Sequence, residues 1–350
     1  MPKRGFMQVV DLHHHFMPLN VLEQLRVVAG GKQRLITEKI SIALNPDLAD
    51  GEAHLEAMDH SGVDVSVLSQ SGLSVLGRDI CRDINEGMAA VAEQWPTRFI
   101  PTAHVCIDDE NAAVELEKCI GQYGFGAVAL PCSSPERQLD DPSLEPLWSV
   151  IENLEIPIIL HPAQLPNGAS LDYALERSCY RPFDTTVAGV RIFNGVLPQH
   201  PGLKFVLPHC GGTIVGLKGR LAMFFERPGV PLHRLLPRTR SEQHSEGLDT
   251  IFEAFWSKLY FDTAGTGAWS PVIEFATSIA GADHMAFGTD YPLESHSGET
   301  MRELVQMIEN LPLEQVDRQQ IASGTAQRLL GTPLTQALGA RGETPSPNSL

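Results

Sequence analysis

Histidines with the spacing of metal ligands follow the first apolar segment of the chain. The sequence DLHHH occupies residues 11–15, directly after an apolar run. On a β-strand, alternate side chains point to the same face, so His13 and His15 can bind one metal ion together while His14 points away. Three other apolar segments also end in a possible ligand: His161, His209 and Asp290.

Each of these residues taken alone is more often structural than catalytic, but their repeated occurrence at the ends of apolar segments favours one shared site. Imidazoles and a carboxylate around an open position are typical of a catalytic divalent metal, most commonly Zn²⁺, with Mn²⁺ as an alternative. The sequence therefore predicts a metal centre that leaves room for water or substrate.

The elements that position these residues are eight short, mostly continuous apolar segments, typical of parallel strands covered on both faces. They cover residues 7–13, 64–69, 98–105, 126–131, 156–161, 204–209, 258–263 and 284–290. Segments with helical periodicity separate them, which predicts βαβ units. With 350 residues, the chain suits one (β/α)8 TIM barrel with insertions, and the carboxyl ends of all eight strands then meet at one rim.

Three segments fall outside this repeat. Residues 17–50 and 227–250 are predicted insertions within a single domain spanning 1–331, and the first insertion is expected to shape the substrate pocket, because connections after barrel strands build the active-site face. Residues 332–350 are predicted to form a flexible tail.

The composition narrows the possible partners and the compartment. A formal net charge of −17 argues against nucleic acid or an anionic membrane surface as a partner. The six cysteines show no CxxC spacing, and no apolar run has the length of a membrane span. We therefore expect a cytoplasmic protein with free thiols.

The motifs also carry a family resemblance. DxHxH at 11–15, LHP at 160–162, HPGLKFVLPHCGGT at 200–213 and FGTDYP at 287–292 resemble the amidohydrolase superfamily, in the branch of aminocarboxymuconate-semialdehyde decarboxylase. The resemblance implies a distorted (β/α)8 barrel with one divalent metal, usually zinc. It implies His13, His15, His161 and Asp290 as ligands, and His209 as the acid/base residue that acts beside Asp290.

Further implications concern the substrate and the assembly. The family places a substrate-binding arginine on the helix after HxGG, sometimes in the neighbouring subunit's pocket. Arg220 occupies that position, and a solvated helix residue is the alternative interpretation. The resemblance also suggests a homodimer or larger homo-oligomer. A second substrate arginine of the semialdehyde decarboxylase has no equivalent in 41–52. Relatives that decarboxylate dihydroxybenzoates commonly have glutamate in place of His13. No lysine occurs in 126–134, which argues against the two-metal, carbamylated-lysine version of the site.

Two further residues lie at or near strand ends. Asp262, at the end of the seventh strand, is predicted either to be structural or to orient a metal-bound histidine, because such a histidine needs a partner for its other ring nitrogen. His104 lies near the end of the third strand, and lining of the pocket by this residue is the less favoured of two interpretations.

The ligands do not by themselves select the reaction. We favour non-oxidative decarboxylation of a small aromatic or unsaturated carboxylic acid. A hydrolase or hydratase acting on a ring-cleavage product, a lactone or a related small carbonyl compound is the alternative, since the same metal chemistry serves both. A non-catalytic metal-binding protein is the third possibility.

Overall fold

The computed structural model describes residues 7–37, 40–163, 173–225, 241, 244 and 247–342. Every predicted strand segment contains at least one short parallel strand. In chain order these are β1 (Val10–His15), β4 (Val65–Ser69), β5 (Phe99–Pro101), β6 (Ala103–His104), β7 (Val128–Pro131), β8 (Ile158–His161), β9 (Phe205–Leu207), β10 (Leu259–Asp262) and β11 (Met285–Ala286).

These strands form a ring. Strands β1, β4 and β5 make a three-stranded sheet, and β6 to β11 make a six-stranded sheet in sequential order. The ring closes between the last strand and the first, because Leu12 N donates to Phe287 O and His15 N donates to Tyr291 O, each at 2.8 Å. The fold is therefore the predicted distorted (β/α)8 barrel.

The third predicted strand, 98–105, is divided in two. Pro101 has no N–H to donate to a neighbouring strand. The next residue, Thr102, bonds back to Leu68 O through its backbone N at 3.2 Å and its Oγ1 at 2.8 Å. Pairing with the following strand then resumes at Ala103, so β5 pairs with β4 and β6 pairs with β7.

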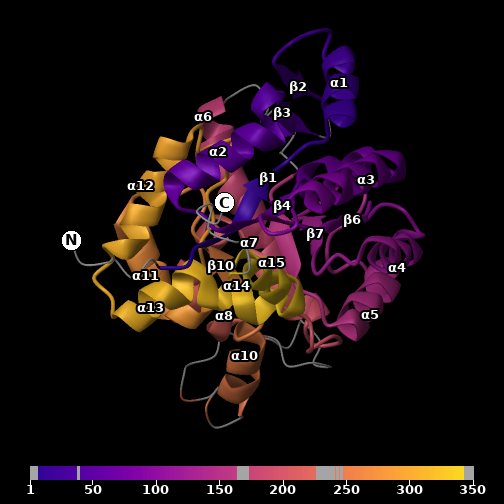
Figure 1. Cartoon of the computed structure of the whole chain (residues 1–350). Helices are drawn as coiled ribbons and strands as arrows, with labels where there is room; N and C mark the ends of the chain where they lie inside the picture. Colours follow the sequence, from indigo (N-terminus) through magenta and orange to yellow (C-terminus); the bar gives the residue numbers. More distant parts are fainter. Residues whose placement is uncertain are drawn as a thin grey trace, which may run out of the picture.

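Helices alternate with the strands around the barrel (Figure 1). They are α2 (Gly51–Ser61), α3 (Arg78–Gln94), α4 (Ala112–Tyr123), α5 (Glu145–Leu154), α6 (Tyr173–Leu175), α7 (Arg181–Arg191), α8 (Lys218–Met223), α10 (Leu248–Trp256), α11 (Ser270–Ala280), α12 (Gly298–Glu309), α13 (Gln315–Gln319), α14 (Thr325–Leu330) and α15 (Thr332–Gly342). Helices α2 and α12 pack side by side, which joins the beginning of the barrel to its end.

The predicted insertion 17–50 has structure of its own. It contains α1 (Leu19–Val28) and the antiparallel pair β2 (Arg34–Ile36) and β3 (Ser41–Ala43). These elements lie together at the top of the view in Figure 1, beyond the ring of barrel strands.

The flexible tail predicted from residue 332 is wrong for 332–342. Helix α15 occupies this segment, with Leu334 completely buried and Ala337 nearly so. Both pack with Val10 and Leu12 in an apolar cluster that also contains α14 residues. Burying apolar side chains against the barrel interior stabilises a helix that composition alone does not predict. Residues 343–350 lie outside the described residues.

Most of the second predicted insertion, 227–250, also lies outside the described residues; its last residues, from 248, begin α10. Among the helices that the structure describes, none combines the length and the apolar character needed to cross a membrane.

Candidate metal centre

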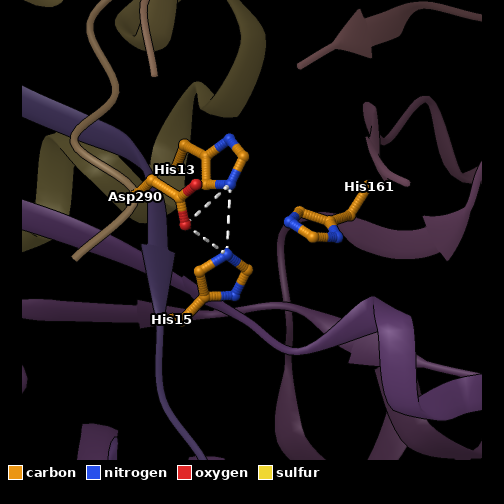
Figure 2. A group of neighbouring side chains, drawn as sticks. All are labelled: His13, His15, His161 and Asp290. Carbon is orange, nitrogen blue, oxygen red and sulfur yellow. Dashed lines mark hydrogen bonds and ion pairs between the residues drawn. The ribbon is translucent and has the colours of Figure 1, made fainter. Parts of the chain in front are cut away.

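Four predicted ligands converge at the carboxyl ends of the barrel strands. His13, His15, His161 and Asp290 are buried, and each offers one ligand atom within 4.8 Å of those of the other three. His13 Nε2 lies 3.2 Å from His15 Nε2, and Asp290 Oδ1 lies 3.0 Å from His15 Nε2. Figure 2 shows His161 facing the other three from the opposite side. The sequence-predicted set is thus brought together.

A β-bulge in β1 turns two of these histidines toward the site. Strict alternation would place His14 on the same face as Val10 and Leu12, which line the apolar barrel interior. However, the register with β4 shifts between Asp11 and His14, where β1 contains one more residue than its partner. Bulges of this kind re-aim side chains beside active sites. His14 instead contacts Asp11 Oδ2 and His54 Nδ1, each at 2.8 Å, as its predicted exclusion from the site requires.

The outer ring nitrogen of each ligand histidine contacts an oxygen acceptor. His13 Nδ1 lies 2.8 Å from Asp262 Oδ2, the contact that the predicted orienting role of Asp262 requires. His15 Nδ1 lies 3.1 Å from Gln70 Oε1, and His161 Nδ1 lies 2.9 Å from Pro162 O. Since carbonyl and carboxylate oxygens only accept, each Nδ1 carries a hydrogen, and in the neutral form of each ring Nε2 then has a lone pair for a metal.

The arrangement of these lone pairs fits a divalent cation. Two unprotonated Nε2 atoms 3.2 Å apart repel one another unless a cation lies between them. Nitrogens about 2.1 Å from one Zn²⁺ are separated by about 3.4 Å in a tetrahedral site, which is close to this distance. In addition, Asp290 Oδ1 is buried and makes no hydrogen bond to a described residue. The residues present therefore fit a divalent metal.

The pKa shifts of the four candidate ligands also fit a bound cation. Burial lowers the pKa of His15, and burial together with His15 lowers the pKa of His161 well below its usual range, so both stay neutral and able to bind a metal. Burial also acts to lower the pKa of His13, but Asp262, with Asp290 and Asp11, outweighs it and raises that pKa to about 9, so a metal would have to displace a proton from His13 Nε2. Burial would raise the pKa of Asp290, but His15 and His209 hold it well below its usual range.

His209 lies beside the four ligands, as predicted for an acid/base residue. Its Nε2 is 3.5 Å from Asp290 Oδ2 and makes no hydrogen bond to a described residue. Its backbone is in the left-handed region, with φ at 56°, and its N–H donates to Asp262 Oδ1 at 2.9 Å. A Cβ on Gly265 would lie 2.8 Å from His209 Cδ2, so only glycine permits this close approach.

The cavity beside this cluster contains residues that the sequence analysis missed. His15, His161, His209 and Asp290 line it. Arg177 and Arg181, from the helical segment before and at the start of α7, also line it, together with Ile40, Ser41 and Ile42 from the first insertion. Part of the first insertion therefore lines this cavity, where it was predicted to shape the substrate pocket. The arginines have no motif around them, and only the helical periodicity of their segment is visible in the sequence.

Two other candidates lie elsewhere. Arg220 is exposed on α8, with its guanidinium 5.1 Å from the ring centre of Phe224, and it does not line this cavity of its own chain. His104 lines a separate cavity between α3 and α4, so the less favoured interpretation, that it lines the pocket, is wrong. It still supports the metal centre indirectly, because its Nε2 accepts from the backbone N of Gln70 at 2.8 Å.

Comparisons with known proteins agree with this geometry. A gamma-resorcylate decarboxylase of Polaromonas sp. is 27% identical over 309 residues, covering 81% of this chain and 87% of its own length. A 2-amino-3-carboxymuconate-6-semialdehyde decarboxylase of Dictyostelium discoideum is 24% identical over 356 residues, covering 92% and 91%. Among solved structures, a Polaromonas dihydroxybenzoic acid decarboxylase with bound manganese and the inhibitor 2-nitroresorcinol has a TM-score of 0.72 at 22% identity, covering 95% of this chain and 99% of its own. The family model described as amidohydrolase matches residues 10–332, and the chain belongs to this family, in the branch that contains these decarboxylases.

Proposed function

We propose that this protein is a metal-dependent non-oxidative decarboxylase of a small aromatic or unsaturated carboxylic acid. The observation that carries the proposal is the position of His209, whose Nε2 is 3.5 Å from a ligand carboxylate and makes no hydrogen bond to a described residue. The names of the two curated relatives, both decarboxylases of small carboxylic acids, support the same reaction class.

The residues have separate tasks in this reaction. His13, His15, His161 and Asp290 would hold the ion, which when bound acts as a Lewis acid toward a substrate oxygen. His209 is placed to donate a proton to the substrate carbon that bears the carboxylate. The bond between that carbon and the carboxylate then breaks, CO₂ leaves, and the bonding electron pair restores the unsaturated system.

We propose Zn²⁺ as the ion, because three imidazoles and one carboxylate suit it, with Mn²⁺ as the alternative that the solved relative contains. The predicted homodimer or larger homo-oligomer, the contact of Arg220 with substrate and the cytoplasmic location belong to the same proposal. Arg220 would have to act on the cavity of a partner subunit, since it does not line its own.

The test is CO₂ release from a panel of salicylate-like and muconate-like acids by the metal-loaded protein. We expect His209→Asn to lower kcat by about 10²- to 10⁴-fold, the usual contribution of a general acid, while the bound metal per chain stays unchanged. Acid production from lactones or ring-cleavage products without CO₂ would support a hydrolase instead. Purification without metal, combined with no gain of activity on adding Zn²⁺ or Mn²⁺, would contradict both enzymes.

A further inference from the structure

Gln70, the residue directly after β4, lines the cavity beside the metal ligands and is 2% exposed. Its backbone is fixed on both sides. The N–H donates to His104 Nε2 at 2.8 Å, and the carbonyl accepts from the N–H of Leu73 at 3.1 Å. The side chain therefore starts from a well-held position at the carboxyl end of a barrel strand.

The contacts of His15 determine which way the Gln70 amide is turned. His15 Nδ1 lies 3.3 Å from Ser69 O, and a carbonyl oxygen can only accept, so Nδ1 carries a hydrogen. The Gln70 amide meets the same nitrogen at 3.1 Å. Its oxygen must lie there, because an NH₂ group would point hydrogens at a hydrogen. Gln70 Oε1 is thus occupied by a candidate metal ligand, and the amide offers only the donors of its Nε2.

These donors have no acceptor in the part of the chain that the structure describes. Gln70 Nε2 makes no hydrogen bond to a described residue. It is also not sealed from solvent, in contrast to the unpartnered Nδ1 of His104. Gly72 and Leu73 line the cavity beside Gln70, and neither has an acceptor in its side chain. A fixed NH₂ group of this kind is suited to an oxygen of a bound molecule.

A site that presents only donors discriminates between substituents of similar size. A hydroxyl or carbonyl oxygen can accept from Nε2, whereas the hydrogens of an amino group would meet the hydrogens of Nε2. A site built to hydrogen-bond one group rejects an analogue that cannot make the bond, because its own polar group is then left unpaired.

We propose that Gln70 donates a hydrogen bond to an oxygen substituent of the substrate, and so selects acids that carry a hydroxyl or carbonyl over acids that carry an amino group at the same position. This substituent is distinct from the carboxylate that is lost. The inference rests on the proposed function, whose substrate it specifies. Gln70 then has two tasks, since its Oε1 contacts His15 and its Nε2 binds the substrate.

The experiment measures the affinity of matched ligand pairs for the zinc-loaded protein by isothermal titration calorimetry. The 2-, 3- and 4-hydroxybenzoates are compared with the aminobenzoates substituted at the same positions, and benzoate is the reference. We expect the hydroxyl compound to bind about 3- to 10-fold more tightly at one position or more, the range of a single hydrogen bond.

Two substitutions separate the tasks of Gln70. Gln70→Met keeps the length of the side chain but removes both donors, while Ser69 O still accepts from His15 Nδ1, so the preference for hydroxyl should disappear. Gln70→Glu keeps an oxygen for His15 and replaces the donors with a second acceptor, so the preference should reverse in favour of the amino compound. The added negative charge weakens both members of a pair and cancels from their ratio.

The metal content and a distant glutamine provide the controls. Zinc per chain should stay unchanged in the Gln70→Glu variant, because its side chain still offers His15 an acceptor. Gln24→Met removes an exposed amide that donates to Asp83, outside the lining of the cavity, and should keep the full preference. If Gln70→Met does not fold, the reversal expected for Gln70→Glu carries the test.

The possible outcomes decide the proposal and the reaction separately. No binding of these acids by the unaltered protein, or no preference for hydroxyl at any position, would refute the proposal. A preference that survives both Gln70 substitutions would also refute it, as would equal weakening of benzoate and all six substituted acids by Gln70→Met. A preference that depends on Gln70, found in a protein that releases no CO₂ from any acid, would uphold the binding role and contradict the decarboxylase.

Discussion

At the candidate metal centre, the side chains come from the ends of barrel strands. In the arginine cluster of Arg34, Glu176 and Arg181, they come from the first insertion and from the segment at the start of α7. Asp262 contacts His13 and accepts from the backbone of His209, whereas Glu176 joins Arg34 and Arg181 across 142 and 5 residues of sequence. The first group therefore depends on the barrel strands, and the second depends on contacts between elements outside them.

The largest expected effect comes from removing a ligand. His161→Ala leaves three ligands and should abolish stoichiometric zinc binding, with activity reduced by about 10³-fold or more. Inductively coupled plasma mass spectrometry of the dialysed protein measures the metal per chain. His60→Ala, at an exposed histidine paired with Glu299, is the control and should retain the metal. Full occupancy in the His161 variant would remove this residue from the ligand set.

The next largest effect concerns the arginine cluster of Arg34, Glu176 and Arg181. Glu176→Ala leaves two arginines near one another without their shared carboxylate, and we expect the free energy of unfolding to fall by about 3 kcal/mol. Urea denaturation measures it. Glu115→Ala, which breaks an exposed pair with Arg82, should cost less than about 1 kcal/mol. Unaltered zinc content in the Glu176 variant would show that the metal centre forms independently of the arginine cluster. Loss of zinc would show that the metal centre depends on that cluster.

A smaller effect is expected for Asp262, which contacts His13 on the ring nitrogen away from the metal site. Asp262→Asn preserves shape but removes the charge that faces His13 Nδ1, so zinc affinity should fall by about 10- to 100-fold. Competition with a chromogenic chelator measures the affinity. The unfolding free energy of the zinc-free protein is the companion measurement, and a large loss there with unchanged zinc affinity would make Asp262 a purely structural residue.

The last expected effect, which is small over any one pH unit, is a pH dependence of the free energy of unfolding. Burial lowers the pKa of His104 to about 3, and burial with the neighbouring His14 lowers the pKa of His54 to about 3. The unfolded chain, with histidine near 6.5, binds more protons between these values, so stability is lost as pH falls from about 6.5 toward 3. Each histidine contributes about 1.4 kcal/mol per pH unit in this range.

His104→Gln tests this dependence, because glutamine keeps an oxygen acceptor for the Gln70 N–H but does not titrate. Its unfolding free energy, measured from pH 7 to 4, should fall less steeply than that of the unaltered protein. Identical slopes would mean that His104 is not the group that takes up the proton.

The sequence was a good guide to the barrel and to the convergence of the four candidate metal ligands, because both follow local rules. Continuous apolar runs mark buried parallel strands, and ligands at strand ends must meet at one rim. It was a poor guide to residues 332–342, because their structure depends on packing against distant parts of the chain. Leu334 and Ala337 have no special pattern, and they form a helix because the barrel interior offers an apolar surface to cover.

For this protein, the sequence by itself determined the type of barrel and singled out the four candidate ligands and His209, which the structure brings together, because residue type and position on a strand carry that information. Only the tertiary structure decided that a bulge turns His13 and His15 to the site, and that Arg177 and Arg181 line the cavity while Arg220 does not. Those features depend on strand register and on contacts between distant segments, neither of which a local pattern contains.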